Sequence, residues 1–169
     1  MTEKIKQVTK RLSEREKISA IIWAVFGVTN TLSFLSTLIF ALPLALLITL
    51  CTLGIYGFVL GMAISSLIST FLFGAWGIYM AIVHFKKSKN ALAPAAGTVE
   101  AYEKSFIFEK STGGVIISLL IALLFGNVIH VLCALYDMLF VREYALDNKD
   151  ALNAAVEATA EAQEEEVLA

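Results

Sequence analysis

The chain has 169 residues, of which 58% are hydrophobic and 17% charged, and its formal net charge at pH 7 is −2. Soluble domains keep about half of their residues apolar and about a quarter charged. The composition therefore excludes an ordinary soluble domain and predicts an all-α integral membrane protein with a single small membrane domain. The few, dispersed basic residues also exclude a nucleic-acid partner.

The N-terminal segment, residues 1–17, is basic, with six Lys or Arg against three Glu. It precedes an apolar run several times too long for a signal peptide, so we interpret it as the start of an uncleaved anchor. Lys and Arg beside a membrane span favour the cytoplasmic side. We therefore expect a multi-pass protein of the plasma (inner) membrane with a cytoplasmic N-terminus.

Residues 18–85 contain no Asp, Glu, Lys or Arg. Because one crossing of a bilayer needs about 20 apolar residues, this run is long enough for two or three spans. Hydropathy divides it into three segments, roughly 18–40, 42–61 and 63–85, with Pro43 and a group of glycines at the turns.

The distribution of basic residues favours two spans in this run. With two spans, the N-terminal segment and the lysines of 86–89 lie on one side of the membrane, as the positive-inside rule prefers. Residues 18–31 then lie in the interface, and the spans are about 32–54 and 60–85. His84 is expected to be an interfacial residue at the end of its span.

A second uncharged run, residues 111–136, predicts one further span. The membrane domain, residues 18–140, is therefore predicted to be a small bundle of three transmembrane helices with the C-terminus outside. The alternative is a bundle of four helices with both termini in the cytoplasm. In either arrangement the polar loop 86–113 contains a short amphipathic helix on the membrane surface, in which Val99 and Tyr102 share an apolar face.

Two stripes of small residues at four-residue spacing are candidates for helix packing. Small residues let membrane helices approach closely, and lipid gives helices no hydrophobic reason to associate. We predict that the stripes hold the bundle together; the alternative is that one of them is the face of an oligomer or the docking site of a partner. The stripes are Gly57, Gly61, Ser65 and Ser69, and Gly114, Ser118, Ala122 and Gly126.

Three polar residues in and after the second run form a possible polar path. Asn127 and His130 are three residues apart, and Asp137 follows His130 by seven, nearly two helical turns, so the last two share a face. An ionisable residue at membrane depth is a functional candidate by default, and histidine exchanges a proton near neutral pH. The alternative is structural: His130 donates one hydrogen bond to a neighbouring helix and Asp137 marks the interface.

The C-terminal tail, residues 141–169, is acidic and rich in Ala and Glu. Its residues favour a helix, but three consecutive Glu at 164–166 and the sparse apolar content predict a solvated, frayed or disordered end. A docking role for the tail is the less favoured alternative.

No catalytic motif, phosphate-binding loop or close pair of metal ligands appears in the sequence, so we predict no enzyme, no cofactor and no metal site. The predicted function is a non-enzymatic helix bundle that acts as an accessory subunit, a scaffold or a membrane-organising component. Its partners are the lipid bilayer and other membrane helices, in a homo- or hetero-oligomer, and no small-molecule substrate is predicted. The alternative is a small oligomeric transporter, channel or holin-like permeation protein that uses Ser/Thr stripes with Asn127 and His130.

Overall fold

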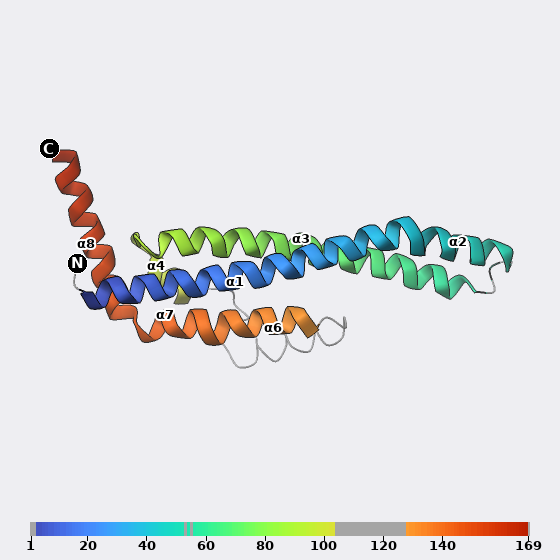
Figure 1. The fold of residues 1–169 in the computed structure, drawn as a ribbon, viewed down its shortest axis with the longest axis horizontal. Helices are drawn as coiled ribbons and strands as arrows, with labels where there is room; N and C mark the ends of the chain where they lie inside the picture. Colours follow the sequence, from blue (N-terminus) through green and yellow to red (C-terminus); the bar gives the residue numbers. More distant parts are fainter. Residues whose placement is uncertain (1–2, 53, 55, 104–127, 169) are drawn as a thin grey trace. The chain divides into compact units, whose positions relative to one another are not determined.

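The computed structural model of the chain describes residues 3–52, 54, 56–103 and 128–168 (Figure 1). These residues form helices joined by short turns, with no strand among them, which confirms the predicted all-α class. The elements in chain order are α1 (Glu3–Ser36), the π-helix η1 (Thr37–Ala41), α2 (Leu42–Cys51), α3 (Gly57–Asn90), α4 (Thr98–Glu103), α6 (Val128–Tyr136), the π-helix η2 (Asp137–Arg142), α7 (Glu143–Asp147) and α8 (Lys149–Leu168).

The first long helix continues through α1, η1 and α2, from Glu3 to Cys51. Pro43 lies in the first turn of α2, directly after the wide π-helical turn η1. A π-turn changes the hydrogen-bond pattern at the point where the proline has no N–H to donate and its ring crowds the preceding turn. Pro43 therefore does not mark a turn of the chain, as the division into three apolar segments had assumed.

The chain reverses between α2 and α3. Gly54 has a φ of +83°, a left-handed conformation that glycine adopts without steric cost, and its carbonyl accepts a hydrogen bond from the N–H of Gly57. This turn interrupts the predicted segment 42–61, because that segment contains the end of one helix and the start of the next. Two helices of the described residues are long and apolar enough to cross a membrane, Glu3–Cys51 and Gly57–Asn90.

The chain folds as two compact units, one made of residues 1–21 and 82–169 and the other of residues 22–81. The second unit is an antiparallel helical hairpin with a very close approach of its two arms. A Cβ atom built on Gly77 would lie 2.6 Å from the Cα atom of Gly27. Only residues without a Cβ allow two backbones to come so near, so these glycines are the packing face of the hairpin.

The predicted packing stripe on α3 is not this face. Within the described residues, nothing outside the local helix lies within 4 Å of a Cβ built on Gly57 or Gly61, and Ser65 is exposed. The prediction that this stripe holds the chain's own helices together is wrong for the described residues, because the arms meet at other glycines. Its role as an oligomer face stays a prediction. The second stripe, Gly114 to Gly126, lies outside the described residues.

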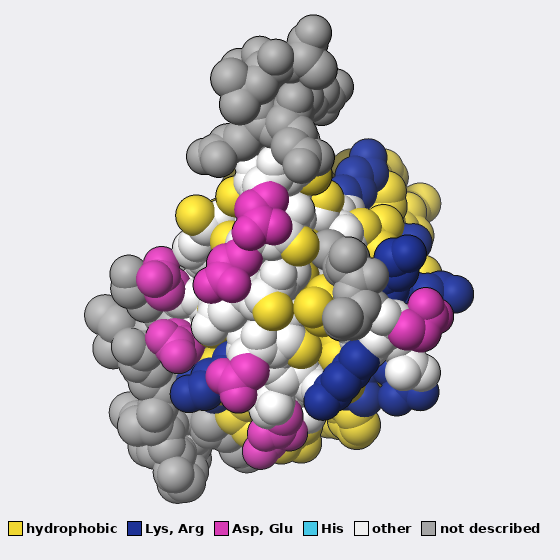
Figure 2. Space-filling view, turned by 90° about the vertical axis from the view of Figure 1, so that its left-hand side faces the viewer, with side chains coloured by type: hydrophobic (Ala, Val, Ile, Leu, Met, Phe, Trp, Pro, Cys, Tyr) yellow, Lys and Arg dark blue, Asp and Glu magenta, His cyan; other side chains and the backbone are white. Residues whose placement is uncertain are grey.

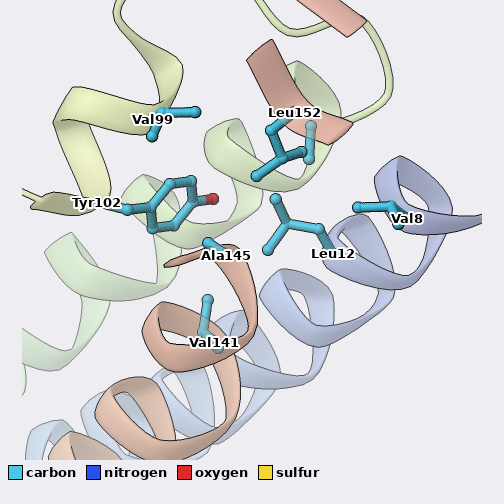
Figure 3. Close-up of a cluster of buried hydrophobic side chains, with 8 residues drawn as sticks. Val8, Leu12, Val99, Tyr102, Val141, Ala145 and Leu152 are labelled. Atoms are coloured by element: carbon cyan, nitrogen blue, oxygen red, sulfur yellow. The ribbon is translucent and has the colours of Figure 1, made fainter. Parts of the chain in front are cut away.

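The first unit has a hydrophobic core to which α1, α4, η2, α7 and α8 contribute (Figure 3). Figure 3 shows the side chains converging between these elements. Four of them, Leu12, Ala91, Ala145 and Leu152, are at most 1% exposed. The buried cluster consists of Val8, Leu12, Ala91, Val99, Tyr102, Val141, Ala145 and Leu152.

Two predictions about this unit need correction. The short helix of the central loop exists as α4, but Val99 and Tyr102 pack into the core and not against a membrane surface. The tail is also not a disordered end, since α8 continues to Leu168 and buries Leu152 and Ala155 completely. A few apolar side chains at helical spacing were enough to hold the start of α8 against the core despite its acidic composition.

Candidate functional site

The most unusual feature of the first unit is a buried histidine between two carboxylates. His84, near the end of α3, is 4% exposed. Its Nδ1 atom lies 2.5 Å from Oε2 of Glu16, which has no exposed surface. Its Nε2 atom lies 3.1 Å from Oδ2 of Asp137, which is 8% exposed. We call Glu16, His84 and Asp137 the Glu–His–Asp cluster.

The two contacts of His84 differ in quality. Nδ1 and the Glu16 carboxylate form a well-aligned hydrogen bond, whereas the Nε2 contact has the distance of an ion pair but lacks hydrogen-bond alignment. Only the imidazolium form has an N–H on both ring nitrogens, and both nitrogens here face a carboxylate oxygen. The geometry therefore favours a positively charged His84 that partly neutralises two buried negative charges.

Each carboxylate has a hydroxyl donor on its other oxygen. The phenol of Tyr102 donates to Oε1 of Glu16 at 2.6 Å, and the hydroxyl of Ser19, itself fully buried, donates to Oδ1 of Asp137. A buried charge is costly unless it is paired and hydrogen-bonded. All four carboxylate oxygens of Glu16 and Asp137 therefore have a polar partner, which offsets the cost of burying the two acids.

The residues of the Glu–His–Asp cluster come together through the spacing of α1 and through one hydrogen bond between α1 and α3 that sets their register. Glu16 and Ser19 are three residues apart, so they share a face of α1. On the antiparallel α3, the hydroxyl of Ser13 donates to the carbonyl oxygen of Ser88 at 2.7 Å, and this contact sets His84 level with Glu16. Asp137 is the first residue of η2, where the helix changes from α to π geometry.

Tyr102 is a neutral donor in this site. Burial, together with the neighbouring Glu16 carboxylate, raises the pKa of the Tyr102 phenol well above its ordinary value. Arg142 adds a peripheral contact, since its Nε donates to the carbonyl oxygen of Tyr102 at 3.3 Å. The phenol therefore keeps its proton at physiological pH and holds the Glu16 carboxylate in place.

Arg15 on α1 contacts Phe140 in η2 and Tyr144 in α7, at the edge of the site. The Arg15 guanidinium donates to the carbonyl oxygen of Phe140 at 2.5 Å, and it lies 4.2 Å from the ring centroid of Tyr144. A cation over an aromatic ring and a charge-assisted hydrogen bond both stabilise the contact. Together with Ser19 and Asp137, Arg15 fixes the position of η2 against α1.

The side chains of the Glu–His–Asp cluster are arranged for charge pairing with one another. Within the described residues, no three His, Cys, Asp or Glu side chains are arranged so that they could hold a metal ion. The hydroxyl of Ser19 points to Asp137 and not to His84, so the geometry differs from that of a nucleophile activated by a histidine base. The acids and the imidazole are directed at one another, and Glu16 and His84 are almost inaccessible to a substrate.

Of the three residues of the predicted polar path, the structure describes His130 and Asp137. Asp137 is buried and contacts Ser19 and His84, and its place at the mouth of a polar path stays a prediction. His130 lies partly buried on α6, seven residues before it. Asn127 lies outside the described residues, so the path as a whole is not tested.

Sequence reasoning missed Glu16, Ser19, His84 and Tyr102 as members of one site. One signal was available in α1, where Leu12, Glu16 and Ser19 follow the spacing of a single helix face. An acid on a buried helix face needs a buried partner, but no local pattern identifies His84 as that partner. The contributions of Tyr102 and Asp137 depend on tertiary packing, which no local pattern shows.

Comparisons with known proteins add no assignment. A scan against protein-family models finds no match, and neither a search of curated proteins nor a search of solved structures finds a similar one.

Proposed function

We propose that the chain is a non-enzymatic membrane scaffold, in which the hairpin 22–81 anchors the protein in the bilayer and the other unit forms a folded helical platform for partners. The observation that carries this proposal is the exposure of apolar side chains on two long helices. Leu32, Phe40 and Leu50 are 61%, 69% and 70% exposed. A long core helix of a soluble protein would be mostly buried, whereas only 6% of the most apolar window of each helix is buried.

The polar side chains of the hairpin are consistent with a membrane environment. Asn30, Thr31, Thr49 and Thr70 each donate a hydrogen bond to the carbonyl oxygen four residues earlier in their own helix. In lipid no water is present to pair with such groups, so bonding within the helix is the available solution. The Ser/Thr content of the hairpin therefore does not argue against insertion.

The length of α3 matches a bilayer. Tyr56 precedes α3, and Trp76 and Tyr79 lie 20 and 23 residues further on, or about 30 and 35 Å at 1.5 Å per residue. This is close to the hydrocarbon thickness of about 30 Å, and Tyr and Trp prefer the two interfaces. Lys86 lies 30 residues after Tyr56, about 45 Å, which corresponds to a bilayer with its headgroups.

The shared core of the other unit supports two crossings, in place of the three spans that the basic residues favoured or the four that hydropathy gives. Val8 in α1, Tyr102 in α4 and Leu152 in α8 belong to one buried cluster. Residues of one core lie on one side of a membrane, so this proposal places α1, α4 and α8 on the same side. Most of the predicted span 111–136 lies outside the described residues. The basic residues near the hairpin favour the cytoplasm as the side that holds the platform.

A scaffold function is favoured over catalysis because Glu16, His84 and Asp137 pair with one another and leave no charged group directed at a substrate. The Glu–His–Asp cluster ties α1, α3 and η2 together, which is the task of a structural site.

Alkaline extraction of membranes that contain the full chain tests the anchor. An anchored hairpin stays with the lipid pellet under conditions that release peripheral proteins. Release of the chain into the supernatant would show that the exposed apolar helices are covered by protein instead.

A further inference from the structure

Five exposed basic side chains lie close to the start of the apolar surface. We call them the basic belt, and they are Lys10, Arg11, Lys17, Lys86 and Lys89. The first three are on α1 and the last two on α3. Figure 2 shows the face that carries α8 and the beginning of α1, where Lys and Arg side chains gather along one margin, apart from most of the acidic ones.

The belt residues of the two helices lie at the same level. Ser13 on α1 contacts Ser88 on α3, and Glu16 contacts His84, so the two antiparallel helices are aligned residue by residue in this region. Positions 10–17 of α1 are therefore opposite positions 84–91 of α3. The belt is one zone of positive charge and not two separate basic segments.

The exposed surface changes from apolar to basic at this level on both helices. On α1, Lys17 is followed by Ile18 and Ile21, which are 47% and 63% exposed. On α3, Phe85 is 51% exposed and is followed directly by Lys86. A ligand that combines an anionic group with hydrocarbon chains fits such a boundary better than a soluble anion does.

The belt side chains form no ion pair with a carboxylate in the part of the chain that the structure describes. The ion pairs of the described residues are those of His84. The ammonium group of Lys89 lies 4.9 Å from the ring centroid of Phe85, so its stem extends back along the apolar surface. The belt therefore keeps its charge available at the edge of the apolar zone.

We propose that the basic belt binds the headgroups of anionic phospholipids. The phosphate of such a lipid meets the Lys and Arg side chains, while its acyl chains lie along the exposed Ile and Phe side chains. The inference rests on the proposed membrane hairpin. It adds a lipid selectivity that anchoring by itself does not require.

The test measures lipid selectivity of the full chain reconstituted in phosphatidylcholine vesicles. Electron paramagnetic resonance of spin-labelled phosphatidylglycerol, compared with spin-labelled phosphatidylcholine, reports which lipid the protein holds. The test variant is K17E/K86E/K89E, and K17R/K86R/K89R preserves the charge. The matched control K4E/K6E/K149E makes the same change in net charge at exposed lysines outside the belt.

The wild-type protein and the arginine variant are expected to prefer phosphatidylglycerol, by up to about fivefold for each belt lysine in contact. The preference is expected to weaken at high salt and to be lost in K17E/K86E/K89E but not in the control. Equal selectivity of the test variant and the control, or no preference in the wild type, overturns the proposal. If alkaline extraction releases the wild-type chain, the proposed anchor fails; if the chain is retained without selectivity, only the lipid site fails.

Discussion

Replacement of His84 by leucine is expected to destabilise the protein strongly at pH 7. The change removes the positive partner of Glu16 and Asp137, which are 0% and 8% exposed. Breaking a buried ion pair by removing one partner costs about 3–5 kcal/mol. For a chain of this size that corresponds to a fall in the melting temperature of about 6–20 °C.

Proton uptake by the two buried acids limits the destabilisation of the H84L variant and makes it depend on pH. An ordinary carboxyl is protonated at pH 7 at a cost of about 4 kcal/mol, and this cost falls by about 2.7 kcal/mol between pH 7 and pH 5. A buried carboxylate without a cation favours its protonated form, so the folded variant takes up protons as the pH falls. The difference in stability between wild type and H84L is therefore expected to be largest at neutral pH and smaller at pH 5.

Thermal unfolding of the detergent-solubilised full chain, followed by circular dichroism at pH 5 and pH 7, measures both effects. The variant E16Q/H84L/D137N removes all charges of the Glu–His–Asp cluster but keeps acceptors for Tyr102 and Ser19. It is expected to be more stable than H84L at pH 7, because no buried charge is left alone. The control H130L removes the other histidine. A melting temperature of H84L equal to that of the wild type, or a deficit independent of pH, refutes the reasoning.

Three further predictions concern separate parts of the fold. Gly77→Leu is expected to disrupt the hairpin, since a Cβ at Gly77 meets backbone at 2.6 Å, whereas Gly61→Leu meets nothing within 4 Å and should melt like the wild type in the same detergent. Because burial raises the pKa of Tyr102 in the folded state, the contribution of Tyr102 to stability is expected to be constant up to about pH 10 and to fall above it, where the same tyrosine ionises in the unfolded chain. The fall in stability above pH 10 should be less steep in Tyr102→Phe, and identical slopes in a pH series of melting curves would contradict the assignment. Leu152→Ala is expected to cost about 2–5 kcal/mol and to expose α8 to limited proteolysis, while Leu92→Ala, at a half-exposed position, should do neither.

The sequence was informative where the signal is local and periodic. The uncharged run 18–85 predicts long apolar helices, and in the structure this run belongs to two long helices, Glu3–Cys51 and Gly57–Asn90. The lysines at 86–89 favoured two spans over three in that run, and the number of spans stays a prediction. The division by hydropathy placed a turn at Pro43, but the helix continues there because the π-turn η1 accommodates the proline. Gly54, in contrast, lies at the turn because its backbone angle demands glycine.

The candidate site depends on contacts that a linear pattern does not contain. Glu16 and His84 are 68 positions apart, and their pairing depends on the register of α1 against α3, in which Ser13 contacts Ser88. The GxxxG of Gly57 and Gly61 was a stronger sequence motif than Gly27 with Gly77, yet the latter pair forms the contact. Small residues allow close packing, but the partner helix decides which of them are used.

The central claim is that the hairpin makes the two crossings and that the ends of the chain share one folded platform. The most direct measurement fuses one reporter of membrane sidedness after Ala169 and, in a second protein, one within residues 90–97. Both reporters are expected on the same side of the membrane as the N-terminus, because Val8, Tyr102 and Leu152 share a core. Reporters on opposite sides would contradict the account, since no single core can then hold α1, α4 and α8 together.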